Sequence, residues 1–365
     1  MKKVTVSKMK LTDREWKEFY IKDIFICENK KKVQVPTGAY IHKENLIKGR
    51  TPRITVTSQN NGIDGYFNSN DGNYRIYNNF ISVSFLGTIF YHPYSASIDM
   101  KVHCLQLIDY TLNIYISKFL ISEIKKSIEM SSYGNQLSST DLPNKKVMIP
   151  VDNSGNPDYS FMEEYVREEE KRKKEKYITY AKKQLETLQY IEVPALEEKE
   201  WGEFSIGGDN GIFIISSGKR LTKADMDNGK IPFIGATDSN NGITNWVGTP
   251  NSTLDSNVLG VNYNGSVVEN FYHPYLCVFS DDVKRLHLKN YKDNKYILLF
   301  FKSIILNQKN KYTYGYKFNA HRMERQKILL PIDEHGIPDY VYMEQYAKNL
   351  IIVKLKKYLA FAKKK

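Results

Sequence analysis

The 365-residue sequence contains only three cysteines, and no two of them form a Cys-x-x-Cys pair. A disulfide framework and a zinc ribbon are therefore excluded, and this cysteine usage is typical of a reducing compartment. No stretch approaches the roughly 18 consecutive apolar residues of a membrane span, and no apolar segment follows the N-terminal Met-Lys-Lys. We therefore expect a cytoplasmic protein with neither a signal peptide nor a membrane-spanning helix.

Motifs that would carry catalysis are also lacking. A DNA methyltransferase needs a Pro-Pro-Tyr-type loop, and the nearest strings, at residues 156–159 and 337–340, lie where helices are predicted to begin. Residues 207–211 do not match the Gly-x-Gly-x-x-Gly pattern of a cofactor turn. His92 and His273 recur in Tyr-His-Pro-Tyr strings without further ligands at metal-binding spacing. We predict no catalytic residue, no metal site and no cofactor bound by the chain itself.

The sequence does contain a long internal repeat. Glu-Trp-x-Glu-Phe occurs at residues 15–19 and 200–204, Asn-Asn-Gly-Ile at 60–63 and 240–243, and Phe-Tyr-His-Pro-Tyr at 90–94 and 271–275. The order is preserved and the offset stays within a few residues of 180. Because solenoid repeats have periods of only about 20–50 residues, we interpret the pattern as a duplicated domain. Two similar domains on one chain can read two sites on one polymer.

The charge of the chain favours a polyanionic partner. The formal net charge is +12 and the pI is about 9.2. Basic charge of this size promotes association with nucleic acid, although it does not define a site. The alternative is that the abundance of Lys, Asn and Tyr only reflects an AT-rich genome.

Each copy has two parts of different character. Residues 11–151 and 196–332 are rich in Gly, Asn, Ser and Thr, and short apolar runs separated by turn residues predict strands. One helical stretch interrupts each part, at residues 114–128 and 295–306. We predict two mostly-β domains of the α+β class.

A long helix is predicted after each β-rich part. Residues 158–189 contain no Gly or Pro and carry four pairs in which Glu precedes Lys or Arg by four residues, which stabilises a helix. At about 1.5 Å per residue, this helix is on the order of 50 Å long. A shorter and more apolar helix is predicted over residues 339–363.

An apolar stripe on each long helix predicts how it packs. Such a stripe needs a partner, and we expect the two helices to pair antiparallel as a coiled coil. The alternative is that each helix packs on its own domain, which the charged residues 163–176 disfavour for the first helix. The predicted interface residues are Ile178, Ala181, Leu185, Leu188, Met343, Ala347, Leu350, Ile351, Leu355 and Tyr358.

Two β-rich domains, each opened by Glu-Trp-x-Glu-Phe and followed by a long helix, resemble the specificity (S) subunits of restriction–modification systems. The resemblance covers nearly the whole chain. Residues 218–225 (GKRLTKAD), together with 229–234 and 240–243, are similar to the target-recognition domains of type I and BcgI-like type IIB enzymes. In the first copy, residues 30–33 (KKKV) and 37–40 (TGAY) replace this run, which fits recognition of a different half-sequence.

The resemblance implies both an architecture and a set of partners. The target-recognition domains would be residues 1–157 and 194–336, and the spacer helices would be residues 158–193 and 337–365. The chain would be a non-catalytic DNA-binding subunit in which each domain reads half of a bipartite target. Its helices would set the half-site spacing and dock two DNA methyltransferase subunits. A restriction (nuclease) subunit, or a fused methyltransferase–nuclease chain, would complete the complex. S-adenosylmethionine, and ATP or Mg²⁺ where used, would be bound by these partners.

Double-stranded DNA is a suitable ligand for such a molecule. Half-sites on one face of B-DNA lie about 34–36 Å apart, which a helix of about 50 Å can span. Residues identical in both copies cannot distinguish two half-sites, so specificity is expected where the copies differ in polar side chains. Arg can bond guanine and Asn or Gln can bond adenine, whereas Lys mostly contacts phosphate.

Each candidate DNA-binding residue could instead be an ordinary solvated residue. The candidates in the first copy are Arg50, Arg53, Gln59, Arg75, Asn135, Gln136, Ser138 and Ser139. The candidates in the second copy are Lys219, Arg220, Lys223, Lys230, Asp238, Lys317, Asn319, His321 and Arg322.

Two other function classes remain open at this point. One is a stand-alone DNA methyltransferase or nuclease with an unrecognised site, which labelled S-adenosylmethionine, or Mg²⁺ and plasmid, would reveal. The other is a tandem module that binds RNA or glycans, although an RNA-recognition-motif signature is absent.

Overall fold

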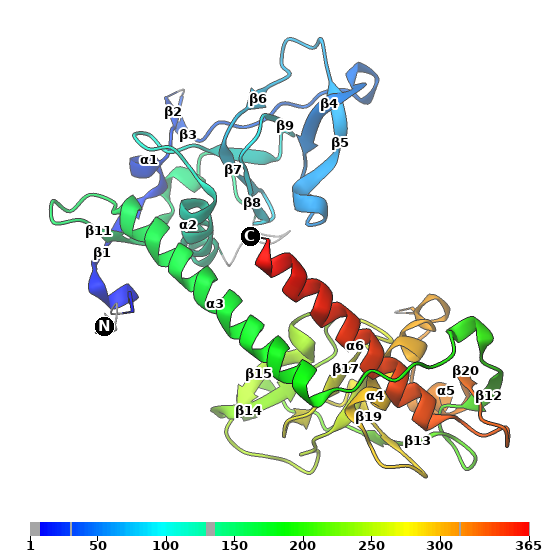
Figure 1. Ribbon diagram of the computed structural model, residues 1–365. Coiled ribbons are helices and arrows are strands. Elements are labelled where there is room, and N and C mark those ends of the chain that lie inside the picture. Colours follow the sequence, from blue (N-terminus) through cyan, green and yellow to red (C-terminus); the bar gives the residue numbers. More distant parts are fainter. Residues whose placement is uncertain (1–7, 30, 129–135, 314, 365) are drawn as a thin grey trace. The chain divides into compact units, whose positions relative to one another are not determined.

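The computed structural model describes residues 8–29, 31–128, 136–313 and 315–364 (Figure 1). The chain forms two compact units, Met1–Tyr177 (unit 1) and Ile178–Lys365 (unit 2). The boundary falls within helix α3 (Tyr159–Thr187). Each unit combines sheets with helices, as predicted for two α+β domains. In the described part of the chain, no helix is both long and apolar enough to cross a membrane.

Unit 1 is built from small sheets covered by helices. Its described strands are β1 (Glu15–Tyr20), β2 (Glu28–Asn29), β3 (Val33–Gln34), β4 (Ile47–Ile54), β5 (Ile63–Asn68), β6 (Ile76–Tyr77), β7 (Phe80–Ser84), β8 (Ile89–His92), β9 (Ala96–Ile98), β10 (Val102–Leu105) and β11 (Lys146–Val151). The sheet orders are β1-β11, β2-β3, β10-β7-β8 and β5-β4-β9-β6. Besides the first turns of α3, its described helices are α1 (Ile21–Ile24) and α2 (Ile114–Ser127), and α2 packs on β8 and β11.

Unit 2 repeats this plan, and the largest described sheet of each unit has four strands. Its described strands are β12 (Trp201–Ser205), β13 (Phe213–Ser217), β14 (Asn228–Ile234), β15 (Ile243–Val247), β16 (Val258–Asn262), β17 (Asn270–His273), β18 (Val278–Phe279), β19 (Val283–Leu288) and β20 (Lys327–Pro331). The sheet orders are β12-β20, β15-β14-β18 and β13-β19-β16-β17. The helices of this unit are α4 (Lys295–Leu306), α5 (Ala320–Arg325) and α6 (Tyr340–Lys363), in addition to the end of α3.

The repeated Glu-Trp-x-Glu-Phe string has the same structural role in both units. It forms β1 and β12, which pair antiparallel with β11 and β20, so that Trp16 is opposite Pro150 and Trp201 is opposite Pro331. Each indole nitrogen donates a hydrogen bond to a leucine carbonyl five residues earlier, at 2.9 and 3.0 Å. The string therefore fixes the first strand of each domain beside its last strand.

Each long helix begins with the same N-terminal cap, an aspartate that is paired with a basic residue. Asp158 and Asp339 accept hydrogen bonds from backbone amides in the first turn, at Phe161 and Tyr342, both at 2.9 Å. Arg14 and Lys199 form ion pairs with these carboxylates at 2.8 and 2.9 Å. An acid at a helix N-terminus satisfies free amides and interacts favourably with the helix dipole. The strings at residues 156–159 (NPDY) and 337–340 (IPDY) are thus turn-and-cap segments at the starts of helices, as predicted.

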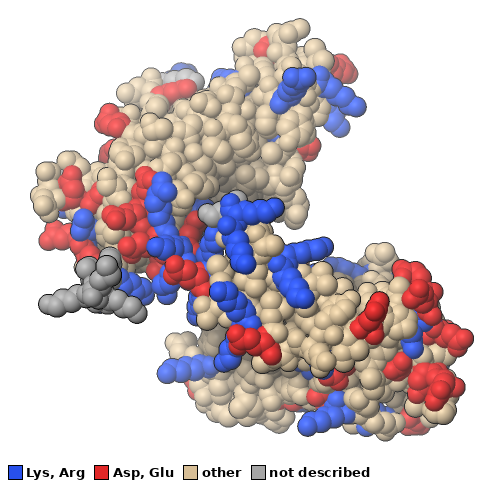
Figure 2. Space-filling view, in the orientation of Figure 1, with Lys and Arg blue, Asp and Glu red and all other residues tan. Residues whose placement is uncertain are grey.

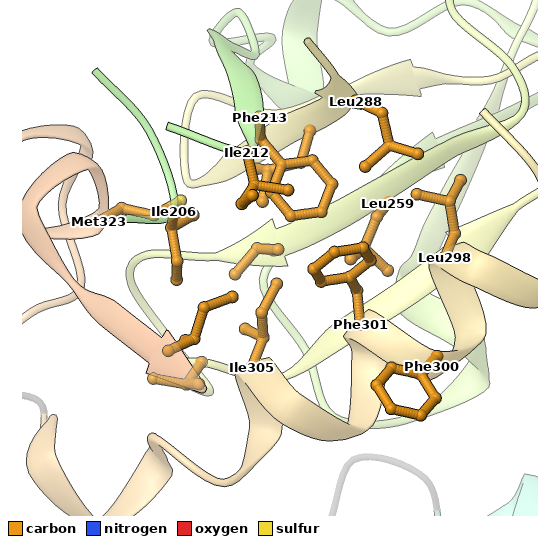
Figure 3. Packing of buried hydrophobic residues seen from close by; sticks show 14 of the residues in the cluster. Ile206, Ile212, Phe213, Leu259, Leu288, Leu298, Phe300, Phe301, Ile305 and Met323 are labelled. Atoms are coloured by element: carbon orange, nitrogen blue, oxygen red, sulfur yellow. The ribbon is translucent and has the colours of Figure 1, made fainter. Parts of the chain in front are cut away.

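The first turn of each long helix is also anchored in the core of its own unit. Met162 in α3 and Met343 in α6 are fully buried and belong to the cores of unit 1 and unit 2, respectively. In unit 2 this core lies between α4 and the β13-β19-β16-β17 sheet (Figure 3). The rings of Phe213 and Phe301 meet edge to face there, with centroids 4.8 Å apart.

Half of the predicted interface residues of α6 are buried. Met343, Ala347 and Leu355 are buried, Ile351 and Tyr358 are half-buried, and Leu350 is 45% exposed. Helix α4 packs on α6, and the ring of Phe300 meets that of Tyr346 edge to face. Packing on its own domain, the alternative considered above, therefore accounts for part of the α6 stripe. The pairing of α3 with α6 stays a prediction.

Burial alternates along the last turns of α3 and the residue that follows it, all of which belong to unit 2. Ala181 is fully buried, and Ile178, Leu185 and Leu188 are half-buried, while most of their neighbours are exposed. The chain that follows α3 runs along α6: side-chain amides of Gln345 and Asn349 donate to backbone carbonyls at residues 189 and 191, at 3.0 and 2.6 Å. The periodicity read from the sequence therefore corresponds to a real pattern of burial.

Candidate nucleic-acid interface

A basic hairpin recurs in both units. It consists of β4 and β5 in unit 1 and of β14 and β15 in unit 2, with antiparallel pairing in each case. The two hairpins correspond at an offset of 180 residues, because Ile54 pairs with Ile63 and Ile234 pairs with Ile243. Each first strand also pairs in parallel with a short buried strand, β9 or β18, which holds the hairpin on its domain.

The turn of each hairpin requires the repeated Asn-Asn-Gly string. Asn61 and Asn241 have φ values of 57° and 52°, and the following Gly62 and Gly242 have φ values of 80° and 77°. This left-handed region is accessible mainly to Gly and, among other residues, to Asn. The string is therefore a scaffold feature, as expected for residues shared by both copies.

A bulge in the first strand of each hairpin carries one basic residue. The register shifts between Lys48 and Pro52 in β4 and between Asn228 and Ile231 in β14. Arg50 and Lys230 lie within these bulges and are exposed. Because a bulge bends the strand and redirects its side chains, both cations are presented to solvent at equivalent positions. Figure 2 shows Lys and Arg side chains gathered over the part of unit 1 where β4 and β5 lie.

The loop that precedes each hairpin starts from a tightly packed glycine. A Cβ atom on Gly38 or Gly218 would lie 1.9 Å from a backbone carbonyl oxygen, so no other residue fits either position. This correspondence aligns Ala39 and Tyr40 with Lys219 and Arg220, and Lys43 with Lys223. The loop of unit 2 is therefore the more basic of the two, and its Lys219, Arg220 and Lys223 are all exposed.

Acidic neighbours of the unit 2 hairpin are held by hydrogen bonds. The carboxylate of Asp227 accepts bonds from the amides of Gly248 and Thr249 and from the Thr249 hydroxyl, and these bonds lower its pKa. Asp225 accepts a bond from the hydroxyl of Thr222. The carboxylates thus close the hairpin and its loop, while the neighbouring cations project into solvent.

Several candidate residues are committed to contacts inside the protein. The guanidinium of Arg53, whose side chain is 12% exposed, pairs with Asp99 at 2.6 Å and with Asp64 at 3.7 Å. Arg75 donates to the carbonyl of Thr37 at 2.8 Å. These contacts hold the guanidinium groups of Arg53 and Arg75 against their own domain, whereas Arg50 in the β4 bulge is exposed.

The candidate residues that precede the last strand of each unit differ in exposure and in hydrogen bonding. Ser138 caps a turn by accepting from the amide of Asp141, and Asn319 caps α5 by accepting from the amide of Arg322. Arg322 donates to the carbonyl of Lys317 at 2.7 Å and lies 3.8 Å from the centroid of the Tyr316 ring. The other placements are as follows: Gln59, Gln136, Asp238 and His321 are exposed, Ser139 and Lys317 are half-buried, and Asn135 lies outside the described residues.

A charged cluster in unit 2 was not anticipated from the sequence. His287 lies between Asp293 and Asp255, with nitrogen–oxygen distances of 2.7 and 3.0 Å, and Arg285 pairs with Asp255 at 2.9 Å. The hydrogen bond to Asp293, with the contribution of Asp255, raises the pKa of His287 to about 9. The cluster ties the loop before β16 to β19 and to the start of α4, so we interpret it as structural. In the described ranges, no group of three or more His, Cys, Asp or Glu is placed to bind a metal ion.

The repeated histidines occupy the interior of each domain, as predicted for structural residues. His92 and His273 have no exposed surface, and burial lowers the pKa of both to about 4. The Nε2 atom of His92 is 2.8 Å from the hydroxyl of Ser82, whereas His273 Nε2 has no hydrogen-bond partner among the described residues. Gly260 stands at the position of Ser82 in unit 2, which explains the difference.

These histidines predict a loss of stability in mild acid. Their pKa is about 4 in the folded chain and 6.5 as a model value, so below about pH 6.5 the unfolded chain binds more protons. Between about pH 7 and about pH 5, each unit should lose about 2 kcal/mol of stability through its histidine. Denaturant unfolding at both pH values measures this loss.

The matched variant for this prediction is His273→Phe. It replaces an imidazole whose Nε2 atom has no hydrogen-bond partner among the described residues with an apolar ring. It should remove most of the pH dependence of unit 2 and leave that of unit 1. His287 affects stability over a different pH range. Because its pKa is raised, the stability that it contributes is present below about pH 6.5 and is lost as the pH rises through about 9. An unchanged pH dependence in His273→Phe would contradict the assignment.

The family model for the "Type I restriction modification DNA specificity domain" matches the chain twice, over residues 13–179 and 198–359. The chain belongs to this family. It is a specificity subunit of a restriction–modification system with two recognition domains, and neither a stand-alone enzyme nor an RNA-binding module is favoured. Specificity subunits are the non-catalytic components of these systems, which agrees with the prediction from the sequence.

A curated relative supports the family assignment. The specificity subunit S.BcgI of a type II restriction enzyme, from Heyndrickxia coagulans, is 43% identical over 308 residues, which cover 82% of this chain and 86% of that protein. Among solved structures, the S subunit of a type I system from M. genitalium has 17% identity and a TM-score of 0.48, covering 98% of this chain and 94% of that chain. The HsdS subunit from Thermoanaerobacter tengcongensis has 11% identity and a TM-score of 0.32, covering 96% and 91%.

For the specificity subunit, one part of the interface was missed by sequence reasoning. Arg50 and Lys230 were both candidates, but their equivalence was not recognised. The sequence contains the pattern that shows this equivalence. A glycine directly precedes each cation (Gly49 and Gly229) and a proline follows it two residues later (Pro52 and Pro232), with 180 residues between the members of each pair. Lys43, which aligns with Lys223, was not among the candidates and is exposed.

Proposed function

We propose that each unit of this specificity subunit binds one half of a bipartite DNA target through its bulged hairpin and the loop before it. The single observation that carries this proposal is the double match of the specificity-domain model, one match for each copy of the repeat. The equivalent exposed cations Arg50 and Lys230 would hold phosphates at the same place in both domains. The loops that start at Gly38 and Gly218 differ in charge, so they would read different half-sequences.

The long helices would set the distance between the two half-sites. Helix α3 has 29 residues, which at about 1.5 Å per residue gives about 43 Å. We propose that its seam of Ile178, Ala181, Leu185 and Leu188 pairs antiparallel with the stripe of α6. The burial of these residues and the bonds from Gln345 and Asn349 support this pairing.

We further propose that the chain acts in the cytoplasm within a larger complex. Two DNA methyltransferase subunits would dock on the helices, and a restriction subunit or a fused methyltransferase–nuclease chain would complete the assembly. S-adenosylmethionine, and ATP or Mg²⁺ where used, would be bound by these partners. The chemistry of the described interface supports this division, because its side chains are cations and amides suited to contacts with DNA.

Methylation mapping tests this proposal. The chain should be expressed with the methyltransferase of the same restriction–modification system, and the genome of the host should be sequenced for modified bases. We expect a split sequence motif that is methylated only when both proteins are present. Methylation of the same motif by the methyltransferase without this chain would overturn the proposal.

Neutralising two cations of the unit 2 loop should weaken DNA binding without abolishing it. For the double variant Lys219→Gln and Lys223→Gln, we expect DNA binding to be about tenfold weaker at moderate salt. The slope of the logarithm of the binding constant against the logarithm of the salt concentration should also be smaller by about 2, because each phosphate contact contributes about 1. Binding of a labelled duplex at several salt concentrations measures both quantities.

The matched control is Lys125→Gln with Lys126→Gln, which removes two exposed cations from α2. It lowers the net charge equally but lies on a helix rather than in a hairpin loop. Equal losses in both double variants would show that overall charge, rather than this loop, determines the affinity.

A further inference from the structure

Both hairpins expose a large aromatic side chain at the same ladder position. Tyr66 in β5 is opposite Pro52, and Trp246 in β15 is opposite Pro232. The two residues are 53% and 50% exposed. Isolated exposed aromatics are common on protein surfaces, but here the same position is aromatic in both copies of the repeat.

Both copies of the repeat have an aromatic side chain at this position, although the residue itself differs. The residues two positions earlier on the same strand, Asp64 and Thr244, differ in charge and size, as expected for exposed positions of a duplicated domain. The aromatic position differs in identity, Tyr against Trp, but retains a large flat ring. Core packing does not explain this, because half of each side chain is accessible to solvent.

Each ring lies on the strand opposite the one that carries the basic bulge. The bulge of β4 ends at the pair of Pro52 and Tyr66, and the bulge of β14 is opposite Val247, the neighbour of Trp246. Arg50 precedes Pro52 by two residues and Lys230 precedes Pro232 by two residues, and both cations are exposed. A hairpin that exposes a ring on one strand and a cation on the other suits the DNA backbone, in which apolar sugars alternate with phosphates. A membrane surface or a second protein offers no such alternation.

We propose that Tyr66 and Trp246 contact the DNA directly, each ring packing on the sugars of the DNA backbone beside a phosphate that is held by Arg50 or Lys230. This inference rests on the proposed function and adds two binding residues to it. A ring face carries no pattern of hydrogen-bond donors and acceptors, so it does not distinguish base pairs in the way that polar side chains do. The two aromatics therefore supply affinity that is shared by both half-sites, and the differing loops supply specificity.

The test uses the full chain in complex with its methyltransferase, and two duplexes that carry either the methylated motif or a scrambled sequence. Tyr66→Ala and Trp246→Ala should each weaken binding to both duplexes about tenfold, through the loss of the apolar contact between one ring and the DNA backbone. The ratio of the two affinities and the methylated motif should stay unchanged. Tyr66→Phe and Trp246→Tyr keep a ring and should bind within about twofold of the unaltered complex.

A control separates this effect from a general loss of apolar surface. Leu329→Ala truncates a side chain of β20 that is 57% exposed, and it should bind DNA normally. All variants should melt close to the unaltered chain, because substitutions of exposed residues change stability little.

The outcomes distinguish failure of this inference from failure of the proposed function. If the unaltered complex does not prefer the motif duplex, the proposed function fails. If it prefers the motif while both alanine variants bind as tightly as the unaltered complex, only the inference is overturned. A changed methylation motif in either alanine variant also overturns the inference, because the ring would then be a reader of sequence.

Discussion

Lengthening α3 by seven residues is expected to abolish methylation of the natural target. The insertion would duplicate residues 169–175 in the charged middle of the helix, a segment that belongs to neither buried cluster. Seven residues add about 10.5 Å and close to two full turns, so the helix faces are nearly preserved while the distance grows. A DNA base pair rises about 3.4 Å, so the new distance corresponds to a spacer that is longer by at most about three base pairs.

The magnitude follows from the loss of one half-site. A complex that can engage only one half of its target falls toward its non-specific affinity, which is typically about a thousandfold or more weaker. Sequencing of modified bases should therefore show at least a roughly hundredfold drop in methylation of the natural motif. Motifs with the same two halves and a longer spacer should appear in its place.

The control for the insertion keeps the length of the helix constant. Lys171→Ala removes one exposed charge from the same segment and should leave the methylated motif unchanged. If the lengthened chain methylated the natural motif at the normal rate, the helix would not be the ruler between the half-sites.

Truncation of Phe301 should produce the largest loss of stability. This side chain has no exposed surface and contacts the ring of Phe213 in the core of unit 2. Phe301→Ala should cost about 3–5 kcal/mol through lost burial and the cavity left behind. For a unit of this size, the melting temperature should fall on the order of 10 °C, as measured by calorimetry.

The loss should be confined to one unit. Because the buried clusters of the two units share no residue, the transition of unit 1 should stay in place in Phe301→Ala. Leu120→Ala, which truncates the buried residue at the equivalent position of α2, should move the other transition instead. One transition that shifts as a whole in both variants would show that the two units unfold together.

Much of the fold was predictable because local signals agreed with one another. The predicted helices at residues 114–128 and 295–306 correspond to α2 (Ile114–Ser127) and α4 (Lys295–Leu306), each begun by an asparagine cap. The helices predicted at 158–189 and 339–363 correspond to α3 and α6 within two residues at each end. Caps, charge pairs and apolar periodicity are local properties, so they can be read from the chain directly.

The site was only partly predictable, because exposure depends on the folded neighbours of a residue. Arg50 and Arg53 are both arginines of β4, and nothing in the sequence distinguished them as candidates. In the fold, Asp99 of a distant turn neutralises Arg53, whereas a bulge turns Arg50 outward. The aromatic pair escaped notice for the same reason, since an exposed tyrosine and a buried one look alike in the sequence.

The sequence by itself determined the duplication, the class of the domains, the places where helices begin and the family to which the chain belongs. These properties depend on order and spacing along the chain, which a sequence states fully. The tertiary structure alone decided which cations are exposed, which histidines are buried without charge, and which aromatic rings reach the surface of the hairpins. Those properties depend on contacts between residues far apart in the chain, and such contacts exist only once the chain has folded.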